Sequence, residues 1–215
     1  MGDSALLDDG VAELGRRERK KIETRSALQH AALELFASKG VDATTVEEIA
    51  DRVDVSPRTF HRYFAAKEDV LFADADERLA VFSAALRTRP VDEPLLSSLA
   101  AAAAEMAGSM VEHTDDERRR LLLIRSTVSL RARNLHYTDE WSSAVAALAA
   151  DRLGQDPRDP LPILLGACTI AALRTAIDRW LESPHADYHA ELAHSFALLA
   201  DLPAATTPRR TGTRR

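Results

Sequence analysis

The segment DVSPRTFHRYFAAKED, residues 54–69, constrains the fold of this chain more than any other stretch. Ser56 followed by Pro57 predicts the start of a short helix, because serine caps helix N-termini and proline is favoured at the first helical position. Phe60 and Phe64 stand at i and i+4, so they lie on one face of that helix. We therefore expect a helix that runs to about Phe64 and packs both rings onto neighbouring helices.

The composition favours helices along the whole chain. Alanine and leucine dominate its 215 residues, only 5% of them are aromatic, and runs of β-branched residues are scarce. With 46% hydrophobic residues, the chain is large enough for one or two compact domains with a real core. We therefore expect an all-α protein.

Two helices are predicted before the opening segment. Apolar residues recur at helical spacing from Ile22 to Lys39, which predicts the first helix. The sequence TTVEE predicts the second, with a capping box made either by Thr44 and Glu47 or by Thr45 and Glu48.

The sequence after Ala66 predicts one long helix followed by a second helical domain. The long helix should begin at Lys67, run to Arg87 and join the two domains. Further helices are expected at 95–112, 115–133, 138–154, 161–182 and 187–202. The resulting division is a flexible acidic N-terminus at 1–15, a three-helix domain at 16–66, a second helical domain at 67–202 and a disordered basic tail at 203–215.

The first domain has the pattern of a helix-turn-helix. Three short helices with a tight turn before the third form such a unit, which places its second helix in the major groove of DNA. Four outward side chains on the helix after Ser56 can read base edges or bind phosphates: Arg58, Thr59, His61 and Arg62. The alternative is a capped surface helix with solvated arginines.

The net charge of −6 is unevenly distributed. Residues 16–25 carry six basic and two acidic side chains, and the C-terminal tail adds four arginines. Because salt screens distant charge over about 8–10 Å, a local basic patch can bind phosphate on an acidic protein. The alternative for residues 16–25 is a solvated helix start.

The stretch from Arg25 to Leu71 closely resembles the N-terminal domain of TetR-family transcriptional regulators. The resemblance rests on LFASKG at the end of the first helix, TTVEEIA in the second, VSPRTFHRYF across the third and KEDVL after it. It implies a repressor that binds a palindromic operator as a homodimer. His61 departs from the pattern, because the family often has tyrosine there, and this departure concerns base preference rather than the fold.

The resemblance also implies a role for each DNA-facing residue. Three residues would contact phosphates: Thr45, Tyr63 and Lys67. Three would face base edges: Arg58, Thr59 and His61. Arg62 could do either, and the basic residues Arg16–Lys21 would reach an adjacent phosphate or the minor groove.

The C-terminal half resembles the TetR subfamily with acyl-CoA-like ligand-binding domains, which is associated with the mycofactocin system. The shared features are an R-x-x-x-x-x-R-A-R segment that begins at Arg125, a tryptophan soon after it, a DP.D loop and an A.RTA.DRW ending. The resemblance implies that residues 67–202 bind an effector such as a fatty acyl-CoA or a similar amphipathic molecule.

Five residues are candidates for effector binding: Met106, Met110, Arg125, Arg131 and Trp141. The methionines follow the alanine run 100–104 and offer adaptable apolar surface, and the arginines could meet an anionic headgroup. The alternatives are close helix packing for the alanine run, a core position for Trp141, and an ion pair with Glu105 or another acid for Arg125.

The same resemblance implies a homodimer through helices 161–182 and 187–202, which family members pair with their copies in a four-helix bundle. The first of these helices has a long apolar strip with little aromatic bulk, formed by Leu164, Leu165, Ala171, Ala172 and Ala176. A dimer would place two recognition helices on a two-fold axis, where they can read two half-sites.

Other functions find little support in the sequence. It has no G-x-S-x-G motif, P-loop or dinucleotide fingerprint, so neither an enzyme nor a cofactor is expected. The single Cys168 excludes an intramolecular disulfide, and His185, His189 and His194 lack a fixed acidic partner for a metal. Without a signal peptide or a run of about 18 apolar residues, the chain is expected to be cytoplasmic and to bind no membrane. A helical adaptor that binds only protein is the remaining alternative.

Overall fold

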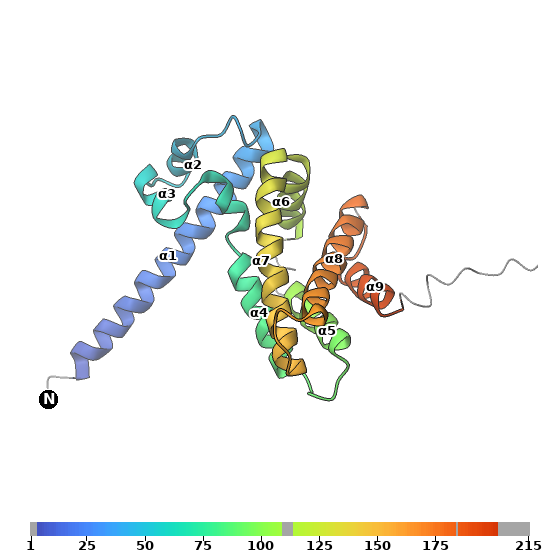
Figure 1. Ribbon diagram of the computed structural model, residues 1–215. Coiled ribbons are helices and arrows are strands. Elements are labelled where there is room, and N and C mark those ends of the chain that lie inside the picture. The colour runs from blue at the N-terminus through green and yellow to red at the C-terminus, as the bar shows by residue number, and fades with distance from the viewer. Residues whose placement is uncertain (1–3, 109–113, 184, 202–215) are drawn as a thin grey trace, which may run out of the picture. The chain divides into compact units, whose positions relative to one another are not determined.

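The computed structural model describes residues 4–108, 114–183 and 185–201, and over these residues the protein is all-α (Figure 1). The described residues form nine α-helices and one 3-10 helix, and they contain no strand. The chain divides into two compact units. Unit 1 is the chain up to Asp74 together with Arg119–Arg131, and unit 2 is Ala75–Arg118 together with the chain from Ala132 onward. The predicted all-α class is confirmed.

Unit 1 contains α1 (Ser4–Lys39), α2 (Val46–Arg52), α3 (Pro57–Tyr63) and the 3-10 helix η1 (Lys67–Phe72). Its core holds Leu28, Phe36, Ile49, Phe60 and Leu71, all nearly inaccessible to solvent. As predicted, α3 begins with Pro57 after the N-cap Ser56, and both of its phenylalanine rings are buried. α2 and α3 thus form a helix-turn-helix, and α2 packs against α1.

α1 begins earlier than the sequence analysis predicted. It is helical from Ser4, so residues 4–15, which we expected to be flexible, form its first turns. The N-terminal half of α1, drawn in dark blue, extends beyond α2 and α3 (Figure 1). Apolar periodicity predicted the helix only from Ile22, because the residues between Gly15 and Ala27 whose burial is described are exposed or half-buried and form no apolar stripe.

The long helix expected from Lys67 to Arg87 is wrong in one respect, because the structure breaks it. η1 ends at Phe72, and α4 (Ala75–Thr88) begins three residues later. Two side chains of α1 bind the residues at the break: the Arg25 guanidinium donates to the Ala73 carbonyl, and the Gln29 amide lies 3.0 Å from the Asp74 carboxylate. These bonds hold the segment against α1.

Unit 2 is built from α4, α5 (Leu95–Gly108), α8 (Pro160–Glu182), α9 (Tyr188–Ala200) and parts of α6 (Thr114–Ser126) and α7 (Val128–Leu153). α6 passes from unit 2 to unit 1 after Arg118, and α7 returns after Arg131. One apolar cluster joins α4, α5, α7, α8 and α9, and includes Phe82, Leu99, Met106, Val145, Leu173 and Phe196. This cluster is the core of unit 2.

The break between α6 and α7 lies at Thr127, whereas the sequence analysis ended one helix at residue 133 and began the next at residue 138. The Ser126 hydroxyl donates to the Leu123 carbonyl over 3.3 Å, and a serine that binds its own backbone competes with the regular helix. The stretch NLHY has neither glycine nor proline, so α7 continues through it.

By length and composition alone α8 could cross a membrane, although Arg174 and Asp178 interrupt its apolar sequence. One such helix carries little weight, because core helices of soluble proteins pass the same test. Its exposed apolar side chains include Leu161, Ile163 and Leu164.

α7 and α8 approach each other closely at Gly166. A Cβ atom at this position would overlap the Ser142 carbonyl oxygen and would lie 3.2 Å from the Ala146 amide nitrogen. Only glycine allows the two backbones to approach this closely.

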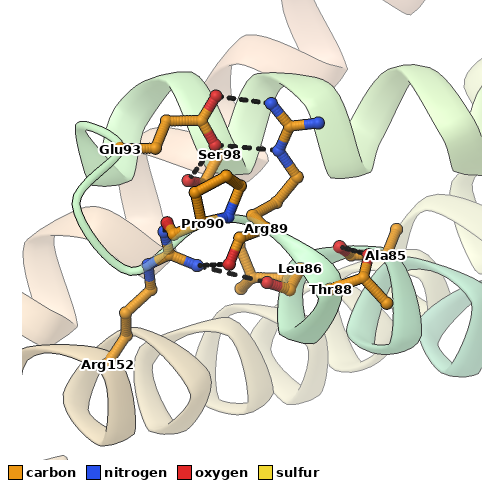
Figure 2. Close-up of polar contacts among 8 residues, drawn as sticks. All are labelled: Ala85, Leu86, Thr88, Arg89, Pro90, Glu93, Ser98 and Arg152. Atoms are coloured by element: carbon orange, nitrogen blue, oxygen red, sulfur yellow. Dashed lines mark hydrogen bonds and ion pairs between the residues drawn. The ribbon is translucent and has the colours of Figure 1, made fainter.

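A polar cluster closes the C-terminal end of α4 (Figure 2). Arg152 of α7 donates to the carbonyls of Leu86 and Arg89, each over 3.3 Å, and also to that of Pro90. Arg89 pairs with Glu93, whose carboxylate also accepts a 2.6 Å bond from Ser98. The Arg89 guanidinium, with help from the Ser98 hydroxyl, lowers the pKa of Glu93 to about 2.

Candidate nucleic-acid interface

The N-terminal end of α2 is fixed by a capping box at Thr45. Its hydroxyl accepts from the Glu48 amide over 3.3 Å, and its own amide donates to the Glu48 carboxylate over 2.9 Å. Of the two predicted boxes, therefore, the Thr45–Glu48 box is the one that forms. Thr44 is buried instead, and its hydroxyl donates to the Gly40 carbonyl over 2.8 Å. Thr45 itself remains exposed beside the turn.

The outer face of α3 presents a set of exposed polar side chains: Arg58, His61 and Arg62. Among the residues that the structure describes, Arg58 has no hydrogen-bond or ion-pair partner. The Arg62 guanidinium lies over the ring of the half-buried Tyr63, 5.2 Å from its centroid. With Phe60 buried on the opposite side, this face offers cationic donors to a partner outside the chain.

Thr59 is half-buried and differs from these neighbours. Its side-chain oxygen lies 3.0 Å from that of Ser56, and its backbone amide donates to the same serine oxygen over 3.1 Å. The Thr59 hydroxyl is thus engaged within the first turn of α3.

The ammonium group of Lys67 is only partly available for a phosphate contact, because it is bound within unit 1. Its Nζ donates to the carbonyls of Val41 and Thr44, each over 2.7 Å. An ammonium group has three N–H donors, so these two bonds leave one for any other acceptor. Lys67 therefore fastens η1 to the loop between α1 and α2, directly before Thr45, and its predicted phosphate contact stays a prediction.

The effector candidates fall into three groups. Met106 is buried in the core of unit 2, and the half-buried Trp141 packs against the same core with its ring 6.3 Å from that of Phe82. Arg125 and Arg131 are exposed and belong to the segment of unit 1. Met110 lies outside the described residues. The structure thus brings only Met106 and Trp141 into one cluster.

Because Arg125 is exposed, it needs no buried anionic partner. Arg78 of α4 does pair with a buried carboxylate, because its guanidinium makes two 2.9 Å bonds with Glu117 on α6. These side chains are only 19% and 10% exposed. The sequence analysis missed this pair because its two members are 39 residues apart and nothing local links them.

Arg118, next to Glu117, binds the end of α8. It donates to the carbonyls of Trp180 and Leu181 over 2.9 and 3.0 Å, and its guanidinium lies 5.1 Å from the centre of the Trp180 ring. An arginine at the C-terminal end of a helix satisfies carbonyls that have no partner within the helix.

No group of three histidine, cysteine or acidic side chains that could hold a metal ion occurs within residues 4–108, 114–183 and 185–201.

A capped α2, a tight turn and an α3 that buries phenylalanines while exposing arginines define a helix-turn-helix DNA-binding regulator. The family model described as "Bacterial regulatory proteins, tetR family" matches residues 28–73, and the one described as "MftR C-terminal domain" matches residues 93–203. The chain belongs to the TetR family and is a transcriptional regulator, not an enzyme. Regulators of this family bind DNA operators as dimers and respond to small-molecule effectors.

Individual relatives agree with this assignment. The chain is 36% identical over 151 residues to the HTH-type transcriptional regulator TcmR of Streptomyces glaucescens, which is 67% of each chain. It is 25% identical over 163 residues to MftR of Mycobacterium tuberculosis, named as a mycofactocin biosynthesis transcriptional regulator, with 76% of this chain and 82% of MftR covered.

Among solved structures, Thermus thermophilus FadR, a TetR-family repressor in complex with lauroyl-CoA, has a similar fold. The TM-score is 0.52 at 22% identity, over 89% of this chain and 99% of FadR.

Proposed function

We propose that this regulator binds a two-fold symmetric operator as a homodimer and represses transcription in the cytoplasm. The observation that carries the proposal is the division of α3 into a buried phenylalanine face and an exposed face with Arg58, His61 and Arg62. Arginine is the commonest side chain for hydrogen-bonding guanine edges, and histidine can also donate in the major groove.

The proposed contacts divide into two kinds. Arg58, Thr59 and His61 face base edges, while Thr45, Tyr63 and the remaining donor of Lys67 hold phosphates on either side, and Arg62 serves either purpose. Four exposed basic side chains in the first half of α1 bind phosphates beside the half-site: Arg17, Arg19, Lys20 and Lys21.

The proposed dimer forms through α8 and α9. Leu161, Ile163 and Leu164 are 46%, 52% and 58% exposed on α8, and Leu198 of α9 is 46% exposed. Large apolar side chains gathered on a surface mark an interface, because their contact with water is unfavourable. A second copy of the same two helices would cover them in a four-helix bundle.

Selection of bound sequences from a random DNA pool, followed by footprinting, tests this proposal. We expect two inverted half-sites on one face of the duplex, with centres about 34–36 Å or somewhat more apart. A single half-site protected by a monomer would refute the dimer, and absence of any selected sequence would refute specific DNA binding.

A variant with Leu161, Ile163 and Leu164 changed to serine should remain folded, become monomeric and lose most operator affinity.

We further propose an amphipathic acyl compound, such as a fatty acyl-CoA, as the effector. Support comes from the MftR C-terminal domain match over residues 93–203, from the apolar core around Met106 and Trp141, and from the lauroyl-CoA bound to FadR. Met110, Arg125 and Arg131 remain candidates for the same ligand.

Titration with acyl-CoAs of increasing chain length, with free CoA as control, tests the effector. We expect changes in the fluorescence of Trp141 and Trp180 and in operator affinity, with a shared chain-length optimum. Because coupling is reciprocal, DNA must weaken acyl-CoA binding by the same factor by which acyl-CoA weakens DNA binding. Tight acyl-CoA binding that leaves operator affinity unchanged would refute the effector role and leave DNA binding intact.

A further inference from the structure

The first turn of α3 contains a side chain whose polar group is directed at the helix itself. Thr59 can offer a partner two chemically different groups, a hydroxyl and a methyl. Its hydroxyl oxygen lies 3.0 Å from the Ser56 hydroxyl oxygen, within hydrogen-bond distance. Ser56 is the N-cap of α3 and already accepts from the Thr59 amide over 3.1 Å.

The bond between the two hydroxyl groups fixes the orientation of the Thr59 side chain, while the amide bond holds its backbone. Threonine is branched at Cβ and has few staggered rotamers, so a hydroxyl turned toward the N-cap directs the methyl group elsewhere. Releasing the hydroxyl would break the bond with Ser56. The hydroxyl keeps some hydrogen-bonding capacity, but the methyl group is the apolar part of the side chain that this orientation leaves for contact outside the helix.

The residues next to Thr59 in the sequence differ from it in exposure and in chemistry. Phe60, the next residue, is completely buried, and its own side chain cannot reach DNA. Arg58 and His61, on either side of this pair, are exposed and supply hydrogen-bond donors. The half-buried Thr59 thus adds one apolar group at the edge of the exposed face that carries Arg58 and His61.

We propose that Thr59 reads a thymine in the operator through contact between its methyl group and the C5 methyl group of the base. The proposal rests on the proposed docking of α3 in the major groove. Thymine alone among the four bases carries a methyl group there, and threonine can contact it through its own methyl. The Thr59 hydroxyl braces the side chain against Ser56 and makes no base contact.

Two variants separate the roles of the two groups. Thr59→Val keeps a methyl group in nearly the same shape and removes the hydroxyl. Thr59→Ser keeps the hydroxyl and its bond to Ser56 and removes the methyl. Thr138→Ser removes a threonine methyl from α7, whose hydroxyl likewise binds its own helix, and serves as the matched control.

The DNA is varied in the same way. Each thymine of the selected operator is replaced in turn by deoxyuridine, which lacks only the C5 methyl group, and the dissociation constant is measured for every variant. Wild-type protein should lose affinity about threefold to fivefold at one thymine of each half-site, as expected for about one methyl group no longer buried.

The proposal predicts a defined coupling between protein and base. Thr59→Val and Thr138→Ser should keep the full loss at that thymine. Thr59→Ser should bind the unmodified operator about threefold to fivefold more weakly and show no further loss on deoxyuridine replacement. Thermal unfolding of each variant shows that the protein remains folded.

Three results would overturn the proposal. The first is a loss of thymine preference in Thr59→Val that Thr59→Ser does not share, because the hydroxyl would then be the reader. The second is equal sensitivity to deoxyuridine in wild type and Thr59→Ser at every thymine. The third is no specific DNA binding by wild type, which would refute the proposed function as well, whereas the first two leave that function standing.

Discussion

The arginines of α3 and those at the C-terminal end of α4 have the same chemistry in opposite settings. Arg58 is exposed and has no hydrogen-bond or ion-pair partner among the described residues. Arg89 and Arg152 of unit 2 are bound to a carboxylate and to backbone carbonyls of the same unit (Figure 2). In unit 2 these side chains hold helices together, and their bonds are complete without a ligand.

This difference separates residues that act on a partner from residues that maintain the fold. A bound arginine contributes to the free energy of unfolding, since its removal leaves carbonyls or a carboxylate without a donor. An exposed arginine contributes little to stability, so its contribution must appear in binding. Substitutions in the two regions should therefore affect two different measurements.

The largest effect is expected at the buried ion pair of unit 2. Glu117→Ala removes the carboxylate that accepts both bonds from the part-buried Arg78 guanidinium and should lower the free energy of unfolding by about 3 kcal/mol. Chemical denaturation measures this loss. The double variant Arg78→Met with Glu117→Leu removes both charges and should recover most of the stability. A double variant as unstable as Glu117→Ala would show that the uncompensated charge is not the cause.

Arg58→Ala should give the complementary result. Loss of a base contact should weaken binding to the selected operator by about 1–3 kcal/mol, while the unfolding free energy changes by less than about 0.5 kcal/mol. Fluorescence anisotropy and denaturation measure the two quantities. Arg158→Ala, which removes an exposed arginine from the loop before α8, is the control and should change neither. Unchanged operator affinity in Arg58→Ala would remove Arg58 from the interface.

Lys67 tests whether one residue of unit 1 can contribute both to stability and to DNA binding. Lys67→Met keeps the aliphatic stem but removes the donor to Val41 and Thr44, so stability should fall by about 1–2 kcal/mol. Operator affinity should fall as well, because the loop before Thr45 loses its anchor. If stability stayed the same while operator affinity dropped, Lys67 would act on phosphate alone and its carbonyl bonds would be unimportant.

The smallest effect concerns pH. The pKa of Glu93 is lowered to about 2 in the folded protein, so its contribution to stability is present above its unfolded pKa, near 4.5, and is lost as the pH falls toward 2. Glu93→Gln should be less stable than wild type at pH 7, and the difference should vanish near pH 2. Parallel unfolding curves at pH 2, 3, 4.5 and 7 measure it. A difference that is constant with pH would exclude the Arg89–Glu93 pair as its source.

The sequence predicted those features that depend on near neighbours. The Ser56–Pro57 start of α3, its buried phenylalanines and the capping box of α2 each involve residues no more than four positions apart, and all are present. The sequence could not choose between Thr44 and Thr45, because that choice depends on Thr44 being buried beneath the loop.

What the sequence could not predict depends on distant partners. The break after η1 involves bonds from Arg25 and Gln29, 48 and 45 residues away from the acceptors that they bind. The Lys67 bonds span 26 and 23 residues, and no periodicity shows which carbonyl an ammonium group will meet. The proposed roles of the DNA-facing side chains stay predictions, because α3 shows which groups are exposed and not which bases they contact.

Gly166 restricts the position of α8, the helix that carries the proposed dimer surface. At this residue the backbone of α8 packs directly against the backbone of α7. Leu161, Ile163 and Leu164 are exposed on the same helix. A side chain can change rotamer to absorb a small rotation of a helix, but a carbonyl oxygen in a helix cannot. α8 can therefore turn about its own axis very little without separating from α7. In the proposed dimer, the surface formed by Leu161, Ile163 and Leu164 would therefore keep a fixed orientation relative to α7 of the same subunit.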